Sequence, residues 1–380
     1  MLNFSRTNDG ILSRWWWTID RPLLFGFLTM IAFGILLAVA ATPMVANRIG
    51  IEEFYFFKRH LLYIAPSLGI IFAISNMSHR NIKIFALILF FAAVFLTFMT
   101  LFFGAEIKGA RRWISLGGFS VQPSEFAKPA FAVLVAWVFS AQQKNPEING
   151  KFIACFLWTI FATALVLQPD FGMLVVTTAV FGIQLFLNGL PIILVVATVI
   201  AGASGFVLAY LFLPHVTARV NKFLDPAVGD HYQINRSLEA FANGGLFGVG
   251  PGEGIIKKHL PDAHADFVFS VLGEEFGFFV CVFVVILIGF IVVHGMFRAL
   301  RNADSFPLLA SIGLLSQFGL QSFVNMASTL HLIPTKGMTL PFMSYGGSSM
   351  FAISVVVGLI LAFSKQKSLG LDERFLSINL

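Results

Sequence analysis

The sequence has few charged residues and few cysteines, and the shortage of charge excludes whole classes of protein. Charged side chains make up 12% of the 380 residues, about half the share found in an ordinary soluble domain. Hydrophobic residues make up 57%, and Phe alone occurs 45 times. A water-soluble domain of this size could not bury so much apolar surface. The composition therefore excludes a soluble enzyme and a disordered chain, and it predicts a helical membrane protein.

The two cysteines, Cys155 and Cys281, lie far apart in apolar runs. They support neither a disulfide framework nor a structural metal site. The net charge of +6 would suggest a nucleic-acid partner in a soluble protein. Here the basic residues stand at the ends of apolar runs, which is typical of membrane topology, so no nucleic-acid partner is expected.

Ten apolar runs are each long enough, or nearly so, to cross a hydrocarbon core of about 30 Å. They lie near 22–46, 59–76, 82–103, 125–142, 152–169, 171–188, 190–213, 266–297, 305–330 and 346–364. No shift in composition marks a domain boundary. The sequence therefore predicts an all-α polytopic membrane protein with about ten transmembrane helices, in a single integral membrane domain over 1–380.

An even number of spans places both termini on the same side of the membrane. The count of Lys and Arg is nearly equal on the two sides and does not decide the orientation. Every short loop on the side of the termini carries excess Lys or Arg, except the turn at 188–191, which favours that side as the inner one. We therefore expect a cytoplasmic segment 1–21, a cytoplasmic tail 365–380 and a large periplasmic loop 214–265.

Three long segments on the outer side are rich in polar residues and glycine. They cover 104–124, 214–265 and 331–345. Long loops of this composition usually carry function, although a spacer that reaches a partner would look similar. The ionisable residues that continue into the flanking helices favour the functional interpretation.

The first outer cluster contains both cations and carboxylates. Arg111 and Arg112 could hold a phosphate, or they could contact lipid headgroups. Glu125 and Lys128 are three residues apart on one face of an expected helix, either as a site or as an ion pair that fixes the helix end. Asp170, in a Pro- and Gly-containing junction, either faces a cavity or caps the next helix.

The large outer loop predicts a short amphipathic helix. Ile234, Leu238 and Phe241 follow the helical spacing i, i+4 and i+7, and Gly244 could end this helix. The glycine-rich segment 244–254 follows it. Backbone N–H groups of such a segment could approach a phosphate.

The cluster around the eighth apolar run is the most informative one. Asp266 heads that run, where it has access to water and could accept a proton; it could equally be an acid that the helix dipole favours. Glu274 lies eight residues further, about 12 Å along a helix. Burying the adjacent carboxylates of Glu274 and Glu275 at this depth in the membrane should cost several kcal/mol of free energy, unless they are hydrated, paired or protonated. His264 precedes Asp266 in this cluster, and Lys258 stands just after the glycine-rich segment.

The last cluster combines a cation, hydroxyl groups and irregular backbone. Lys336 supplies the cation, Ser344 and Tyr345 the hydroxyls, and Gly346 and Gly347 follow. A rigid re-entrant turn would explain the same residues. Together, the clusters predict one outward-facing polar site that suits an amphiphile with a phosphate head and a lipid tail.

In this order, the clusters closely resemble those of the SEDS family (shape, elongation, division and sporulation proteins). The motifs that carry the resemblance are GARRWISLGGFSVQPSEFAK, LQPDFG, LPDAHADFVFSVLGEEFG and PTKGMTLPFMSYGGSS. The resemblance covers nearly the whole chain. The runs GVGPGEGIIKKHLPDAH and RWWWTIDR are similar to those of the division branch of the family rather than the elongation branch.

The resemblance implies a peptidoglycan glycosyltransferase that polymerises lipid II at the division septum of the bacterial inner membrane. The family's catalytic aspartate falls on Asp266, in the motif His264-Ala265-Asp266-Phe267, where Ala265 replaces the Thr common in the family. The substrate-binding residues are expected among Arg111, Arg112, Glu125, Lys128, Asp170, Gln233, Lys258, His264, Glu274, Lys336, Ser344, Tyr345, Gly346 and Gly347.

The resemblance further implies partners: lipid II as donor and acceptor, a class B penicillin-binding transpeptidase (FtsI), divisome regulators and membrane lipid. No cofactor is certain, although a divalent cation, Mg²⁺ or Mn²⁺, could assist the leaving group. Three alternatives stay open: a lipid II flippase, an elongation-type polymerase, and a scaffold that only recruits the transpeptidase. Transport would use intramembrane charges such as Glu274 for the lipid headgroup.

Overall fold

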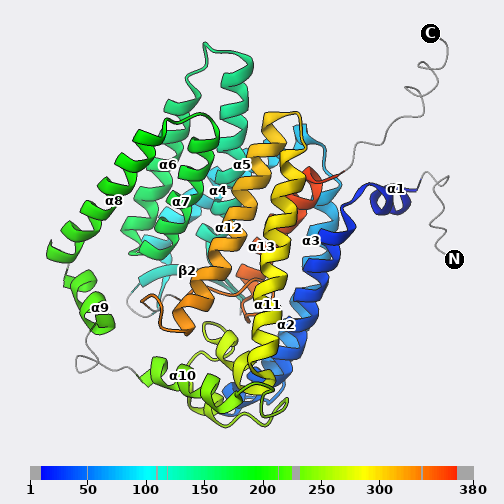
Figure 1. Cartoon of the computed structure of the whole chain (residues 1–380), viewed down its shortest axis with the longest axis vertical. Helices are drawn as coiled ribbons and strands as arrows, with labels where there is room; N and C mark the ends of the chain where they lie inside the picture. The colour runs from blue at the N-terminus through cyan, green and yellow to red at the C-terminus, as the bar shows by residue number, and fades with distance from the viewer. Residues whose placement is uncertain are drawn as a thin grey trace.

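The computed structural model of the chain describes residues 10–48, 50–107, 110–117, 119–212, 214–224, 232–334 and 337–365. Helices dominate, and a small sheet joins them (Figure 1). The helices are α1 (Ile11–Thr18), α2 (Arg21–Arg48), α3 (Tyr55–Ser75), α4 (His79–Phe103), α5 (Pro123–Lys144), α6 (Gly150–Leu167), α7 (Phe171–Leu187), α8 (Ile192–Phe212), α9 (Pro214–Leu224), α10 (Tyr232–Gly244), the 3₁₀ helix η1 (Ile256–His259), α11 (Val268–Leu300), α12 (Ser305–Thr329) and α13 (Gly347–Phe363).

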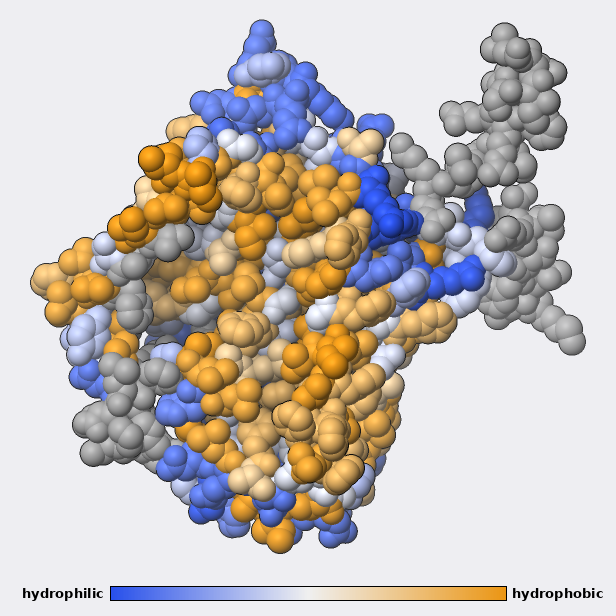
Figure 2. Space-filling view, in the orientation of Figure 1, coloured by the Kyte–Doolittle hydropathy of each residue, from blue (hydrophilic) through white to orange (hydrophobic). Residues whose placement is uncertain are grey.

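Each of the ten apolar runs forms a helix, namely α2 to α8 and α11 to α13. Within the described residues, seven of these helices are long and apolar enough to cross a membrane, and α7 and α13 are shorter apolar helices of 17 residues each. Figure 2 shows a broad hydrophobic belt, with hydrophilic residues gathered above and below it. The protein is therefore a multi-pass membrane protein.

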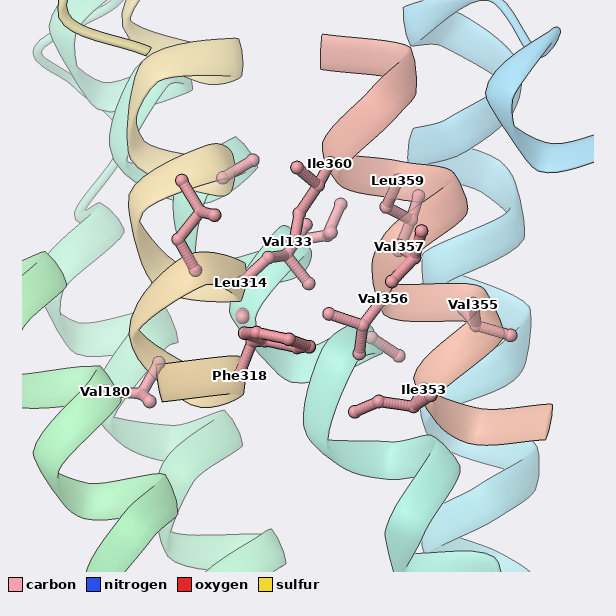
Figure 3. Packing of buried hydrophobic residues seen from close by; sticks show 14 of the residues in the cluster. Val133, Val180, Leu314, Phe318, Ile353, Val355, Val356, Val357, Leu359 and Ile360 are labelled. Carbon is pink, nitrogen blue, oxygen red and sulfur yellow. The ribbon is translucent and has the colours of Figure 1, made fainter. Parts of the chain in front are cut away.

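Helices α5 and α12 form the centre of the bundle. In each, 72% of the most apolar 18-residue window is buried, against 28% in α3 and in α11. Figure 3 shows side chains of α12 and α13 facing each other, with Phe318 and Leu314 opposite Val356. The segment of helix α5 from Ala130 to Ala136 is buried throughout, and three of its seven residues are Ala. Small residues of this kind let helix backbones approach closely in a membrane.

The outer segment 104–124 folds into a small antiparallel sheet, which the all-α expectation did not include. Its strands, in the order β1-β2-β3, are β1 (Ala105–Ile107), β2 (Ala110–Leu116) and β3 (Phe119–Val121). Ile114 pairs with Val121, and Gly117 makes the turn between β2 and β3 with a φ of +54°. Such short strands with few alternating apolar residues give little periodic signal in a sequence.

The large outer loop forms the helices α9 and α10 and the 3₁₀ helix η1, with α10 at the lower end of the molecule in Figure 1. Helix α10 ends at Gly244, as its sequence predicted. Ile234 is buried, and the ring of Phe241 packs against Phe269 of α11 at 5.7 Å. Leu238, by contrast, is 39% exposed.

Glu274 holds the loop that follows α10. Its side chain is fully buried. Oε1 accepts hydrogen bonds from the backbone N–H of Ile255 (2.8 Å) and Ile256 (2.7 Å) and from Nδ2 of Asn243 (3.0 Å). Oε2 accepts from the N–H of Lys257 at 2.9 Å. Four protein donors thus replace the water that this carboxylate would otherwise need, and in this structure Glu274 offers no surface to a substrate.

Glu275 is neutralised by a buried lysine from the same loop. The ammonium of Lys257 pairs with the Glu275 carboxylate and also donates to the carbonyl of Ala40 in α2 at 2.8 Å. Both charged side chains are at most 2% exposed. The requirement that the two carboxylates be hydrated, paired or protonated is therefore met by a hydrogen-bonded cage for one and an ion pair for the other.

The glycine-rich segment 244–254 packs against a break in α11. Gly277 interrupts the helix with a φ of +79°, and a Cβ there would lie 2.3 Å from the backbone N of Gly248. The N–H groups of Val249 and Gly250 donate to carbonyl oxygens of α11, each at 3.0 Å. These N–H groups are therefore not available to a phosphate, which corrects the expectation for this part of the segment.

We predict that Lys257→Met destabilises the protein, because it leaves the buried Glu275 without its cation. Breaking one side of a buried pair costs about 3–5 kcal/mol. Thermal unfolding of the purified protein in detergent measures the effect. The double variant Lys257→Met with Glu275→Leu should recover much of the loss, and Lys258→Met, at the exposed neighbour, should change the free energy of unfolding by less than about 0.5 kcal/mol. Equal losses for the two single lysine variants would contradict the pairing.

Candidate active site

Asp266 stands on a turn at the outer end of α11. The turn covers 261–266, and the N–H of Asp266 donates to the carbonyl of Asp262 at 3.0 Å. Helix α11 begins only at Val268. Asp266 therefore precedes the helix by two residues instead of heading it, and its partly exposed side chain is reachable from water.

Two residues from other segments fix the position of Asp266. Nδ2 of Asn325, fully buried in α12, donates to the carbonyl of Asp266 (3.1 Å) and to that of Met338 (2.6 Å). Gly337 lies so close that a Cβ there would be 2.9 Å from Oδ2 of Asp266. The backbone of Asp266 is thus tied to α12, and its carboxylate lies against Gly337.

Aromatic rings form a wall beside Asp266. The ring of His264 lies 5.1 Å from Phe56 of α3 and 5.4 Å from Tyr345, whose N–H donates to the His264 carbonyl at 2.8 Å. Burial lowers the pKa of His264, against the opposing charge of Asp262. The imidazole is therefore neutral at pH 7 and brings no permanent positive charge to a phosphate. Burial likewise raises the pKa of Tyr345, which keeps its hydroxyl protonated.

Arg59 of α3 supplies a cation next to this wall. Its Nη1 donates to the hydroxyl of Tyr55 at 2.8 Å, and its guanidinium lies over the rings of Tyr55 (5.4 Å) and Tyr63 (5.7 Å). Its charge acts on Tyr345, where it opposes the rise in pKa. The sequence interpretation missed Arg59. The signal was present as YFFKRHLLY at 55–63, an aromatic and basic run at the outer end of the second span.

Lys128 lies in a buried polar chain beneath the site. Its Nζ pairs with Glu125 at 2.9 Å and donates to Oε1 of Gln321 at 3.0 Å. Nε2 of Gln321 donates to the carbonyl of Thr339 at 3.1 Å. The predicted Glu125–Lys128 pair is confirmed as an ion pair. Only 2% of the Lys128 side chain is exposed. Lys128 is therefore linked to the segment of Thr339 through Gln321.

Arg112 and Asp170 hold the junction between α6 and α7. Arg112 donates from Nε to the carbonyl of Gln168 (3.0 Å) and from Nη2 to that of Pro169 (2.6 Å). Its Nη1 lies 3.7 Å from Oδ2 of Asp170, while Oδ1 accepts the N–H of Met173 at 3.2 Å. The capping interpretation of Asp170 is thus confirmed.

Arg111, next to Arg112 on β2, faces away from that junction. It is half-exposed and pairs with Glu106 at 3.5 Å. A guanidinium paired at this distance on an exposed surface is weakly held, because water screens the attraction. Of the two adjacent arginines, Arg111 is therefore the one that an incoming phosphate could reach.

Some of the remaining candidate residues have a structural role, and others make no side-chain hydrogen bond or ion pair with the described residues. The hydroxyl of Ser344 accepts the N–H of Leu340 at 2.8 Å, and a Cβ at Gly347 would lie 2.8 Å from Phe119, so both support a rigid turn. Gly346 caps α13. Gln233 is half-buried on α10 and Lys258 is exposed on η1, and neither makes a side-chain hydrogen bond or ion pair with the described residues. Lys336 lies outside the described residues.

A possible cation site was tested on the side chains present. Among the described residues, no three His, Cys, Asp or Glu side chains lie together in a way that could hold a metal ion. The residues that surround Asp266 are instead an amide, aromatic rings and a glycine. In the described part of the chain, these side chains do not supply the set of oxygen ligands that a divalent cation prefers.

Comparison with known proteins places the chain in a family. The family model of the FtsW, RodA and SpoVE cell cycle proteins matches residues 21–369. The chain belongs to this family. The match confirms the resemblance to the SEDS proteins and covers all the helices from α2 to α13.

Relatives of the chain in this family are similar over almost their whole length. A protein of Caulobacter vibrioides named probable peptidoglycan glycosyltransferase FtsW is 40% identical over 365 residues, which are 96% of this chain and 94% of that protein. The FtsW protein of Tolumonas auensis is 35% identical over 371 residues, with 93% and 96% covered. Stage V sporulation protein E of Bacillus subtilis is 32% identical over 354 residues, with 91% and 97% covered.

Solved structures of the family share the fold. A chain from a structure titled for the coordination of polymerization and crosslinking by a peptidoglycan synthase complex matches with a TM-score of 0.76 and 27% identity, covering 91% of this chain and 97% of that one. The rod shape determining protein RodA of Thermus thermophilus matches with a TM-score of 0.68 and 26% identity, covering 92% and 97%.

We predict that Asn325→Leu loosens the segment from Gly337 onward, because the carbonyls of Asp266 and Met338 lose their shared donor. An unsatisfied buried group costs about 1–3 kcal/mol. Hydrogen exchange of the backbone amides in 337–346 should become faster, and the melting temperature should fall. Ser322→Ala, whose hydroxyl bonds only within α12, is the matched control. Unchanged exchange in 337–346 of the Asn325 variant would show that this amide does not hold the segment.

Proposed function

We propose that this chain is a peptidoglycan glycosyltransferase that polymerises lipid II into glycan strands of the septal cell wall. One observation carries the proposal: Asp266 presents a partly exposed carboxylate at the outer end of the bundle, on a backbone that Asn325 holds and with Gly337 close to its Oδ2. Membership of a family whose named members include peptidoglycan glycosyltransferases supports it. The apolar bundle below the site suits the lipid tail of the substrate.

The carboxylate of Asp266 acts as a general base in the proposed reaction. It takes the proton from the 4-hydroxyl of the GlcNAc unit of the acceptor. The oxygen then attacks C1 of the donor MurNAc, the bond from C1 to the pyrophosphate oxygen breaks, and undecaprenyl pyrophosphate leaves with inversion from α to β. The leaving group carries its own negative charge, so the proton stays on Asp266 until water removes it.

Cations near Asp266 stabilise the leaving pyrophosphate. Arg59 lies beside the aromatic wall, and Arg111 is half-exposed on the neighbouring sheet. Lys336, the residue before Gly337 in the sequence, completes the proposed set. Arg112 and Lys128 act by positioning, since their donors are used within the protein.

The proposed setting is the bacterial inner membrane at the division septum, with both termini in the cytoplasm. This orientation places Asp266 on the periplasmic side, where lipid II is used. A class B transpeptidase of the FtsI type is the proposed partner, together with divisome regulators. The similarity to a chain of a peptidoglycan synthase complex that coordinates polymerization with crosslinking supports such a partner.

Asp266→Asn tests the general base directly, because it keeps the size and the backbone of the side chain and removes its basicity. We expect polymerisation of lipid II by the purified complex to fall at least about 100-fold, with unchanged folding and partner binding. Asp262→Asn, in the same turn at a φ of +53° that Asn tolerates, is the matched control and should keep its activity. Equal glycan from both variants would eliminate Asp266 as the base. Lipid II movement across vesicles, without polymer from the wild type, would favour transport.

Gly337→Ala should lower activity without unfolding the protein. The new methyl group would lie 2.9 Å from Oδ2 of Asp266, and a flexible carboxylate moves aside at little cost. A misplaced base loses rate steeply, so we expect about a tenfold or greater fall in polymerisation. Gly69→Ala, on α3 with no atom within 4 Å of its new Cβ, is the control. Full activity of the Gly337 variant would show that the carboxylate is not confined at this edge.

A further inference from the structure

A second polar cavity lies at the other end of the bundle from Asp266. It has a volume of about 490 Å³ and forms where α1, α2 and α11 meet. Asp20, which lines it, directly precedes α2, whereas Ala41 near the far end of α2 packs with Ala263 and Phe267. About 20 helical residues, or 30 Å, separate the two sites. The cavity is therefore independent of the candidate active site.

The charges in this cavity do not balance. Asp20 accepts the N–H of Leu23 with Oδ1 (3.1 Å), and the same oxygen lies 3.2 Å from Nε2 of His294. Its Oδ2 pairs with Nε of Arg298 at 3.2 Å. Arg21 and Arg301 also line the cavity, and among the described residues neither pairs with a carboxylate. Among the described residues that line the cavity, three arginines and one carboxylate give a net charge of +2, without counting the histidine.

The helix dipole explains only part of this cluster. Arg298 and Arg301 stand at the C-terminal end of α11, where a cation is favourable. Arg21, by contrast, is the first residue of α2, where the positive end of the dipole disfavours a cation. Its guanidinium lies over the rings of Trp16 (5.1 Å) and Trp17 (4.6 Å). A bound anion would offset the unfavourable placement of Arg21.

The surroundings of the cavity are those of a membrane surface. Trp17 and Phe297, both on its rim, are 36% and 63% exposed. Tryptophan prefers the level of the lipid headgroups, where one end of the ring meets water and the rest meets acyl chains. In Figure 2, hydrophilic residues gather at the upper right above the hydrophobic belt, on the side where Figure 1 places α1.

We propose that this cavity binds the headgroup phosphate of an anionic phospholipid from the leaflet on the side of the termini. Arg21 and Arg301 contact the phosphate, while Trp17 and Phe297 lie against the start of the acyl chains. Basic pockets between membrane helices recognise anionic headgroups in this way. The site is separate from the proposed glycosyltransferase activity and does not depend on it.

Native mass spectrometry of the full chain, equilibrated with phosphatidylglycerol and phosphatidylethanolamine in turn, tests the site. The variant Arg21→Gln with Arg301→Gln removes the two cations that pair with no carboxylate in the described part of the chain. The matched control, Arg80→Gln with Lys151→Gln, removes the same charge from exposed positions at the starts of α4 and α6. By helix order, these positions lie on the same side as the cavity.

We expect the wild type and the control to retain one phosphatidylglycerol in preference to phosphatidylethanolamine, and the cavity variant to bind it about 30-fold more weakly. Phosphatidylglycerol should also raise the melting temperature of the wild type and the control, but not that of the cavity variant. Equal retention by both variants would overturn the proposal. Protection by soluble glycerol 3-phosphate equal to that by phosphatidylglycerol would also overturn it, in favour of a soluble phosphate ligand.

Discussion

The high cost of an unpaired charge in a membrane bundle organises the outer half of this protein. Glu274 and Glu275 lie fully inside α11, and the described residues that satisfy them belong to the end of α10 and to the loop that follows it. The carboxylates therefore act as fixed points onto which the loop after α10 must fold. Because that loop leads directly into the turn of Asp266, these buried charges also help to position the Asp266 carboxylate.

The amides of α12 provide the second constraint on the site. Gln321 and Asn325 are one helical turn apart and donate to the carbonyls of Thr339 and Met338 in the irregular segment before α13. Backbone without regular hydrogen bonds is stable at this depth only when side chains replace those bonds. The same donors tie Asp266 to this segment and link it through Gln321 to the ion pair of Lys128.

Much of the bundle could be predicted from the sequence, because long apolar runs give a strong signal. All ten runs are helices. Asp170 caps the start of α7 and Gly244 ends α10, as the sequence suggested. Ion pairs between residues close in the sequence could be predicted equally well, because the spacing of Glu125 and Lys128 brings them together on one face of a helix.

What the sequence could not show were contacts between distant segments. Nothing near Glu274 in the chain identifies its donors, which come from 243–257, so it was interpreted as a substrate ligand. Arg112 was similarly expected to meet a phosphate, yet carbonyls 56 and 57 residues away occupy it. The local partners of Arg59, Tyr55 and Tyr63, are visible in the sequence, but only the fold brings this cation to Tyr345, almost 300 residues away. The fold is needed to decide which ionisable residues can contact a substrate, because those that pair within the protein are not available to it.

The central claim is that this chain forms glycosidic bonds at its outer face. The most direct measurement is the product stoichiometry of the purified chain with its transpeptidase partner, supplied only with lipid II. The account predicts β-linked glycan and one undecaprenyl pyrophosphate released for each new bond. Lipid II that crosses the membrane intact, with no pyrophosphate released, would contradict it.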